Sequence, residues 1–447
     1  NEHSCLAHTL LRGLGSGKIE PRLPQEDESD DHAAPEAPAL AMPLAELDGA
    51  GANRLVGGTP RHEAPIIGHR VRQAWRKGAA ISAYNPVEWE FHFDTGLDSI
   101  SAPQNQVAEL AALAAAVADQ SGQAVPDNLQ AVVGAAEPGE DQARLARRLA
   151  EADEGLVLFG QSGKAHGQAS LLRALARYIA YATSCAVTEL LMGGHARGAW
   201  ASGAVPHRGP AGGAASQGKN VQQMLEAPLD AYVLWGIEPG FDIANPAQAV
   251  KTLCAADKVI VVASHAASGL YEMGDVILPL AAQPESEGSM VNLDGMELSW
   301  AAAAEPLGQA RPGWKILRRL GGELAPERFR QTGLADLHSD MQLSAAQEPV
   351  EPAAVRLQAA PPPAEGLYRI GEVPLNAVDA LCRRSEPLQQ SVHAANDWVG
   401  LNPADAERLG GRVTDADLLF LDAPVSGGVG GAESGQPRRA NVNQLME

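Results

Sequence analysis

Apolar positions follow the same rhythm in three parts of the chain, at 54–86, 155–190 and 231–266. Each part reads as an apolar strand, a glycine-containing turn, an amphipathic helix and a second strand. Strands that are apolar throughout are typical of parallel sheets covered by helices on both faces. The pattern therefore predicts an α/β fold of parallel, doubly wound sheets, with the turns gathered at the carboxyl ends of the strands.

Local signals support this interpretation in the first of the three parts. Its helix places Ile67, Val71 and Ala74 on one face, and Gly78 is suited to the carboxyl-terminal cap. GAGANR at 49–54 interrupts the preceding strand and leaves only a short one.

Composition shifts divide the chain into five segments. They are a first α/β domain at 1–150, a second α/β domain at 151–270, a strand and loop at 271–344 that return to the first domain, a linker at 345–366, and a C-terminal module at 367–447. The acidic, Pro/Ala-rich stretch 24–43 reads as a loosely packed loop. We expect the first domain to be a fragment without its N-terminus, because the chain opens on NEHSCLAHTLLRG, inside a helical pattern.

Charge limits the partners. The 34 Lys and Arg residues against 55 Asp and Glu residues give a net charge of −21, with the run EDESDD at 26–31. Such a field disfavours nucleic acid and anionic lipid as direct partners. The longest apolar run, LAALAAAVA at 110–118, is far shorter than the ~20 residues that a membrane helix needs, so we expect no direct membrane insertion.

Cysteine spacing speaks against a local metal site. Cys5, Cys185, Cys254 and Cys382 are too far apart for a CxxC or related ligand motif.

GQSGKA at 160–165 is not a phosphate-binding loop, because Ala165 follows the lysine where Ser or Thr is required. The histidines and serines near the turns show no spacing that predicts a base–nucleophile couple.

The tail string FLDAPVSGGVGGAESG at 420–435 resembles the substrate-side motif of 3-hydroxyisobutyrate-type dehydrogenases. Those enzymes also need a GxGxxG fingerprint upstream and a catalytic lysine downstream, and neither is in place here. We interpret the string as a local coincidence or a foreign junction. A hydroxyacid dehydrogenase is kept as a third alternative.

Several longer motifs, taken in order, resemble one family. They include VGGTPRHEAPIIGHRVRQAWRKGAAISAYNPVEWEF, YVLWGIEPGFDIANPAQAV, DVILPLAAQPESEGSMVNLDGMELSW and EPLGQARPGWKILRRLGGEL. Over roughly residues 1–410 the chain resembles the C-terminal half of the molybdopterin-oxidoreductase-like subunit of bacterial NADH:quinone oxidoreductase, respiratory complex I. Residues 411–447 do not continue that pattern, so we expect an atypical tail and an incomplete C-terminal β module.

That half of the subunit resembles the molybdopterin oxidoreductase superfamily, in which strand-end loops hold a bis-pterin cofactor. The resemblance implies that the corresponding residues here mark a vestigial pterin site. The candidates are Gly57, Gly58, Asn85, Gly236, Glu238, Glu287 and Asn292.

Departures from the superfamily pattern favour a site that has lost its cofactor. Met296 stands where the superfamily has Arg, and Val87 stands where many members carry Arg. Cofactor diphosphates require positive charge and backbone donors. We therefore expect no cofactor, no metal and no catalytic residue in this chain, and no molybdopterin. The resemblance places iron–sulfur clusters only on the missing N-terminal half.

The resemblance implies a non-catalytic structural part of the peripheral arm of an NADH:quinone oxidoreductase. That complex transfers electrons from NADH to quinone and couples the transfer to proton translocation. The implied partners are other hydrophilic-arm subunits, and the implied location is cytoplasmic, peripheral to the inner membrane. The alternative is a molybdopterin-binding oxidoreductase subunit similar to formate dehydrogenase.

Overall fold

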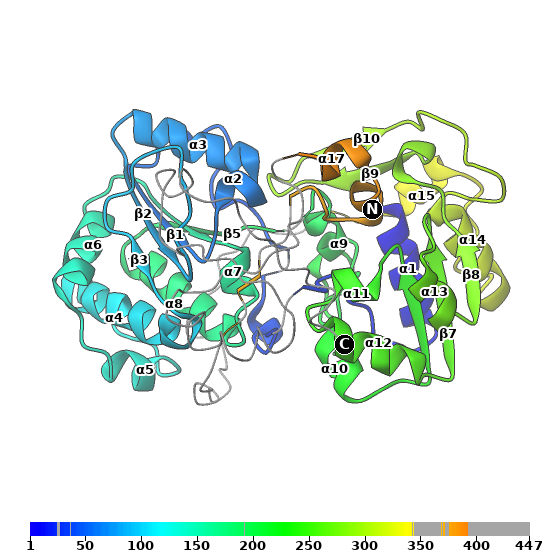
Figure 1. Ribbon diagram of the computed structural model, residues 1–447, viewed down its shortest axis with the longest axis horizontal. Coiled ribbons are helices and arrows are strands. Elements are labelled where there is room, and N and C mark those ends of the chain that lie inside the picture. Colours follow the sequence, from blue (N-terminus) through cyan, green and yellow to red (C-terminus); the bar gives the residue numbers. More distant parts are fainter. Residues whose placement is uncertain are drawn as a thin grey trace, which may run out of the picture.

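The computed structural model describes residues 1–24, 27–35, 37–191, 193–341, 343, 368, 370–371 and 375–391. These residues form two lobes, each built around a parallel sheet (Figure 1). The mixed α/β architecture with parallel sheets confirms the fold class that the apolar pattern predicts. None of the helices in these ranges has the length and apolar character needed to cross a membrane.

A five-stranded parallel sheet in the order β3-β2-β1-β4-β5 forms the centre of the first lobe. Its strands are β1 (Ala52–Val56), β2 (Ala80–Asn85), β3 (Ser99–Ile100), β4 (Gly155–Phe159) and β5 (Ala186–Glu189). β1 and β4 are buried along their whole length. The winding direction reverses between them, so the loops after β1 and β4 meet at the topological switch point.

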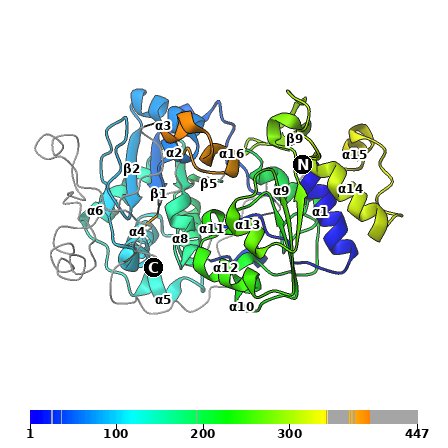
Figure 2. The same cartoon turned by 45° about the vertical axis from the view of Figure 1, so that its right-hand side comes forward.

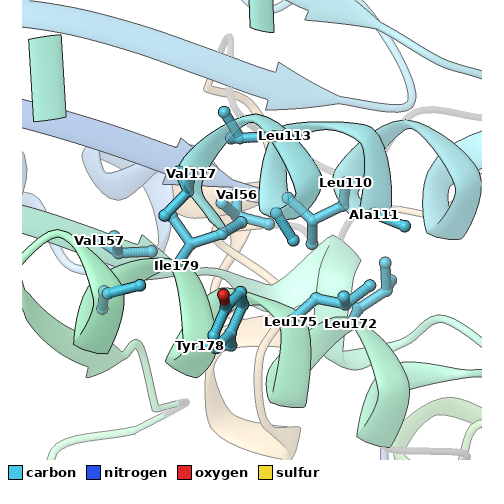
Figure 3. Close-up of a cluster of buried hydrophobic side chains, with 14 of the residues drawn as sticks. Val56, Leu110, Ala111, Leu113, Val117, Val157, Leu172, Leu175, Tyr178 and Ile179 are labelled. Atoms are coloured by element: carbon cyan, nitrogen blue, oxygen red, sulfur yellow. The ribbon is translucent and has the colours of Figure 1, made fainter. Parts of the chain in front are cut away.

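Helices cover both faces of this sheet, which is why its central strands β1 and β4 are buried throughout, including Asn53 and Arg54 of β1. On one face, Val56 packs with Leu110 of α4 and Tyr178 of α8 in a single core (Figure 3). On the other face, Ile67 and Val71 of α3 pack against Leu55 and Ile81. The helices of this lobe are α2 (Pro60–Glu63), α3 (Pro65–Arg76), α4 (Pro103–Ser121), α5 (Gln130–Gly134), α6 (Glu140–Ala150), α7 (Gln161–Lys164) and α8 (Ala169–Ala182).

The predictions for the helix in the first part of the chain are confirmed. Ile67, Val71 and Ala74 form the buried face of α3. Gly78 follows the helix with φ +101°, a conformation that only glycine adopts without strain. The interruption expected at GAGANR is wrong, by contrast: Ala52, Asn53 and Arg54 of this string belong to β1, which is as long as β4 and fully buried.

The division expected at 150/151 runs through this lobe. Strand β4 pairs directly with β1, and Leu55 lies opposite Leu158. The first two βαβ parts therefore share one sheet, while the third begins another. A repeating strand–helix rhythm does not show where one sheet ends and the next begins, because the local burial pattern is the same in both cases.

The second lobe contains a three-stranded parallel sheet in the order β6-β7-β8. Leu253 and Leu270, from α12 and α13, cover one face, while α1 and α14 lie on the other side (Figure 2). Strand β8, expected to return to the first domain, instead pairs with β7. The elements are β6 (Ala231–Trp235), β7 (Lys258–Ala263), β8 (Val276–Pro279), α1 (Glu2–Gly13), α9 (Ala196–Ala201), α10 (Val221–Glu226), α11 (Pro239–Asp242), α12 (Pro246–Cys254), α13 (Ser268–Met273), α14 (Gly313–Leu324) and α15 (Leu334–Asp340).

An antiparallel hairpin, β9 (Gly288–Val291) and β10 (Glu297–Trp300), extends from the second lobe toward the first. At its tip, the Leu293 carbonyl accepts a hydrogen bond from the Leu40 amide, 3.0 Å away. Near the end of the described chain, two short helices precede the tail: α16 (Ala380–Arg383) and α17 (Glu386–Gln389). The linker predicted at 345–366 and the tail after 411 lie outside the described residues.

The acidic stretch is packed more tightly than its composition suggests. Glu28, Asp30 and Asp31 are only 9%, 3% and 7% exposed, and a 3-10 helix, η1 (Asp31–Ala33), begins at the last of them. The prediction of a loosely packed loop at 24–43 is therefore wrong for these residues. The reason is that Arg22 and the buried Arg173 pair with these acids.

Candidate functional site

The loops after β1 and β4 meet through glycines. A Cβ atom on Gly57 would lie 2.4 Å from the backbone nitrogen of Gly163, and one on Gly58 would lie 2.7 Å from the Cα of Gly160. Gly57 also has φ +62°. These glycines therefore allow two backbones to touch, and the contacts of Gly57 and Gly58, which the sequence singled out as site candidates, are with the chain itself.

A carboxylate of the protein occupies the backbone donors at this switch point. The Glu63 carboxylate at the end of α2 accepts a hydrogen bond from the Thr59 amide at 2.7 Å and another from the Gln161 amide at 2.8 Å. Amides at helix starts are the groups that usually bind a phosphate. Sequence reasoning missed Glu63, although an acid one turn after GGTP is a recognisable signal.

Asn85 completes this group at the end of β2. It is buried, and its Nδ2 atom lies 3.5 Å from the carbonyl oxygen of Gly58. Within the described chain its Oδ1 atom has no hydrogen-bond partner. The structure thus brings Gly57, Gly58 and Asn85 together at one sheet edge.

This group does not fit a phosphate-bearing cofactor. The amides that would receive a diphosphate already bind the Glu63 carboxylate, and a second anion beside it would be repelled. The facing glycines bring the backbones of the two loops into contact at this point.

Replacing Glu63 by glutamine tests the role of this carboxylate. Glutamine keeps one oxygen acceptor for two donors, so we expect the free energy of unfolding to fall by roughly 1–3 kcal/mol. Urea-induced unfolding followed by circular dichroism measures the change. Glu323→Gln is the control, because Glu323 is exposed and pairs with Arg319 on the same helix. Equal urea midpoints for the two variants would contradict this role.

Gly236 and Glu238 lie at the edge of the other sheet, after β6. Gly236 has φ +67°, and its amide donates to the Val262 carbonyl at 2.7 Å. Glu238 is buried and accepts hydrogen bonds from Arg384 at 2.5 Å and Arg383 at 3.0 Å. Burial alone would raise the pKa of Glu238, but the two arginines outweigh it and lower the pKa.

Glu287 and Asn292 belong to the hairpin. Asn292 uses its side chain within the turn, where Oδ1 accepts a hydrogen bond from the Met296 amide at 2.8 Å. Glu287 is half-buried immediately before β9. The seven predicted site residues therefore lie in three separate places: the first sheet edge, the second sheet edge and the hairpin.

The structure also brings together a serine and a histidine that the sequence did not connect. Ser4 Oγ lies 3.1 Å from His195 Nε2. Burial lowers the pKa of His195 to about 3, so the ring is neutral at pH 7. In the residues with defined positions, its Nδ1 atom has no partner. Without an acid to orient the ring, this pair lacks the third member of a catalytic triad.

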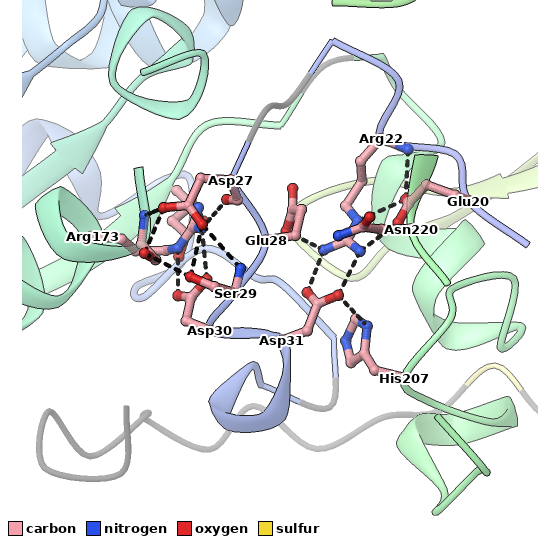
Figure 4. Close-up of polar contacts among 12 residues, drawn as sticks. Glu20, Arg22, Asp27, Glu28, Ser29, Asp30, Asp31, Arg173, His207 and Asn220 are labelled. Atoms are coloured by element: carbon pink, nitrogen blue, oxygen red, sulfur yellow. Dashed lines mark hydrogen bonds and ion pairs between the residues drawn. The ribbon is translucent and has the colours of Figure 1, made fainter. Parts of the chain in front are cut away.

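A network of buried ions lies between the lobes (Figure 4). On one side, Arg173 of α8 forms two hydrogen bonds of 2.8 Å with the Asp30 carboxylate. On the other side, Arg22 contacts Glu20 and Asp31 at 2.6 Å each, and also Glu28. The sequence showed the acids at 26–31 only as a run of charge, because a partner such as Arg173 is far away along the chain.

Three carboxylates around one guanidinium cannot all be ionised at low cost. Burial raises the pKa of Glu28 to about 8, against the attraction of Arg22. Burial would also raise the pKa of Asp31, but Arg22 and its hydrogen bond hold that pKa below the usual range. Of Glu28 and Asp31, Glu28 is therefore the acid whose protonated form burial favours.

Glu28→Gln tests this protonation through pH dependence. In the parent, Glu28 binds a proton in the folded state up to about pH 8 but loses it near pH 4.5 when unfolded. The free energy of unfolding of the parent therefore falls as pH rises through this window, and glutamine removes this contribution. We expect the urea midpoint of the variant, minus that of the parent, to increase between pH 5.5 and pH 8. A constant difference would contradict the assignment.

No group of three or more His, Cys, Asp or Glu side chains in the described ranges is arranged to hold a metal ion. The four cysteines are free thiols.

Comparisons with known proteins give two family matches. Residues 1–323 match the family described as Molybdopterin oxidoreductase. Residues 377–437 match the NAD binding domain of 6-phosphogluconate dehydrogenase. The second match includes the 420–435 string, so the dehydrogenase resemblance of the tail extends beyond that string. Most of this region lies outside the described residues.

Two solved structures have a similar fold. One is the formyltransferase/hydrolase complex FhcABCD from Methylorubrum extorquens, in complex with methylofuran, with a TM-score of 0.50 and 16% identity over 73% of this chain and 89% of that chain. The other is acetylene hydratase from Pelobacter acetylenicus, with a TM-score of 0.50 and 12% identity over 66% of this chain and 49% of that chain. The present chain thus spans about half of acetylene hydratase. At these identities the likeness shows the fold alone.

Proposed function

The chain belongs to the molybdopterin oxidoreductase family, and from this premise we propose that it is a non-catalytic structural part of the peripheral arm of an NADH:quinone oxidoreductase. The order of its motifs supports this proposal, since they resemble the molybdopterin-oxidoreductase-like subunit of that complex over most of the chain. In this role the chain carries no cofactor and docks against other hydrophilic-arm subunits on the cytoplasmic side of the membrane.

The observation that carries the proposal is that a carboxylate of the chain itself binds the backbone amides at the switch point of the first sheet. In an α/β protein, ligands bind at the carboxyl ends of the strands, where the winding reverses. Here Glu63 bonds to the amides of both loops at that point. A protein that used this edge for a polyanionic cofactor would need those backbone amides to be free. A scaffold, in contrast, becomes more rigid when one of its own carboxylates binds them.

An uncovered apolar row on the second sheet supports docking. Val233, Ile260 and Val276 lie side by side in register across β6, β7 and β8. Val233 is 53% exposed and Val276 is 47% exposed. Parallel sheets are usually covered on both faces, and α1 and α14 pack against Trp235 at the carboxyl end of this one. An apolar face of this kind favours a protein partner.

Co-purification from the native bacterium tests the proposal. We expect the tagged chain to bring down hydrophilic-arm subunits of the NADH:quinone oxidoreductase, identified by mass spectrometry. Val233→Lys should reduce their recovery by at least about tenfold, because a cation would be buried in an apolar interface. Leu307→Lys is the control, since Leu307 is 82% exposed and lies outside the row. Absence of these subunits from the parent preparation would refute the proposal.

A second candidate, a molybdopterin-binding oxidoreductase subunit, is favoured by the family and by one atom. The Oδ1 atom of Asn85 is buried without a hydrogen-bond partner among the described residues, which is unusual unless a ligand or water meets it. Elemental and pterin analysis of the chain, purified anaerobically from its own bacterium, distinguishes the two. Molybdenum or tungsten with a pterin would establish the second candidate, and their absence would favour the scaffold.

A further inference from the structure

The amino end of α8 has the donors of an anion-binding site. Helix α8 is 14 residues long, and its first turn offers the amide of Ser170. Arg173 and Arg177 follow at intervals suited to one helix face, and both are buried. Lys164, at the end of the preceding α7, is only 2% exposed. A helix start beside an arginine fork is the arrangement that binds phosphate groups.

The local charge without the acidic segment is positive. Glu189 at the end of β5 is the acid that the first lobe itself contributes: it lies 2.7 Å from Arg177 and 3.5 Å from Arg173. Among the described residues of the first lobe, the two buried arginines Arg173 and Arg177 thus share the Glu189 carboxylate. Leaving this excess charge buried would be costly, so an anion is needed.

Carboxylates of the segment 27–31 fill this requirement. Asp27 Oδ2 accepts hydrogen bonds from the Ser170 amide at 2.9 Å and from the Ser170 hydroxyl at 2.5 Å. Asp30 engages Arg173 through both carboxylate oxygens, at 2.8 Å each. Figure 4 shows Asp27 and Asp30 on the Arg173 side, while Glu28 and Asp31 point the other way.

The opposite side of the same segment is bound to residues of the second lobe. Asp31 pairs with Arg22 and lies 3.3 Å from His207 Nδ1. The Arg22 guanidinium in turn lies 5.3 Å from the centre of the Trp200 ring. Within this short segment, Asp27 and Asp30 therefore bind the first lobe, and Asp31 binds the second lobe.

We propose that residues 27–31 are a resident polyanion: they fill, from within the chain, a site at the start of α8 that fits a diphosphate group, and they join the two lobes by doing so. The carboxylates of Asp27 and Asp30 stand where the two phosphate groups would bind. The site is therefore closed to outside anions as long as the segment is seated, and it becomes available when the segment is neutralised. This inference is independent of the role in the respiratory complex.

Asp27→Asn/Asp30→Asn in the full chain, with inorganic pyrophosphate as the probe, tests the proposal. The variant keeps the shape of the segment but leaves Arg173 and the α8 amides without their anions. We expect its unfolding temperature to fall below that of the parent and to rise by about 3–6 °C when pyrophosphate exceeds its dissociation constant about 100-fold, at constant ionic strength. The parent should shift by less than about 1 °C under the same conditions, because its site is filled.

Asp94→Asn/Asp153→Asn is the matched control, because it changes the net charge equally at two exposed positions. It should respond to pyrophosphate no more than the parent does. An equal response of the control and the test variant, or no response of the test variant, would overturn the proposal.

A second pair of variants covers the case in which the double variant does not fold. Asp30→Asn alone releases the Arg173 guanidinium while Asp27 is retained, and Asp30→Asn/Arg173→Gln additionally removes the arginine. We expect pyrophosphate to stabilise the first and not the second. If both respond equally, Arg173 is not part of an anion site, and the proposal fails.

Discussion

Gly57→Ala is expected to lower the free energy of unfolding by roughly 3–5 kcal/mol, the sum of a backbone strain and a steric clash. The residue has φ +62°, which disfavours any side chain. In addition, the new Cβ would lie 2.4 Å from the nitrogen and 2.6 Å from the Cα of Gly163. Both are backbone atoms, so the loop after β4 would have to move. The urea midpoint of the first lobe's unfolding transition reports the change.

Gly122→Ala separates the two contributions. Gly122 has φ +68° at the end of α4, but nothing lies within 4 Å of the position that a Cβ atom would take there. Only the backbone strain remains, so we expect a loss of about 1 kcal/mol. If Gly57→Ala were no worse than Gly122→Ala, the two loops would not be in the close contact that the structure shows.

Arg22→Met is expected to destabilise the protein by roughly 3–5 kcal/mol at pH 8. The Arg22 side chain is 9% exposed, and its guanidinium is the shared partner of Glu20, Glu28 and Asp31. Methionine approximates the volume of the stem but leaves buried acids without their counter-charge. Thermal and urea unfolding, compared with the parent, measure the loss.

The same variant should be less impaired at pH 5 than at pH 8. Without Arg22, burial raises the pKa values of the remaining acids in the folded state above their unfolded values. Stability is then present at low pH and is lost as pH rises through that window. Arg144→Met is the control, because the Arg144–Asp141 pair is exposed and should change stability by no more than about 0.5 kcal/mol. A loss independent of pH would show that Arg22 acts through packing and not through charge.

The elements that the sequence predicted best are those whose signal is local. Ile67, Val71 and Ala74 show the buried face of α3 in their spacing alone, because one turn of helix separates them. Gly57 and Gly236 were identified because a strand followed by glycine marks a turn, and both have positive φ. The α/β class followed from the alternation of such units.

The candidate site was predicted only in part. Gly57, Gly58 and Asn85 do meet at one edge, since parallel strands end on the same side. Glu63 was missed, although its two hydrogen bonds define what the edge can bind. Asn292 was selected through the family resemblance, while its amide oxygen is used by its own hairpin turn.

The sequence by itself determined the strands, the helix faces and the turns of this protein, because each depends on residues within one or two turns of one another. The tertiary structure alone decided that β4 joins β1, that Glu63 bridges two loops, and that Asp30 meets Arg173 across 143 positions. The physical reason is range. The periodicity of buried positions depends on residues that are neighbours in the sequence. A buried charge, in contrast, is tolerated only beside a counter-charge, and that partner can come from a distant part of the chain that only the folded structure brings close.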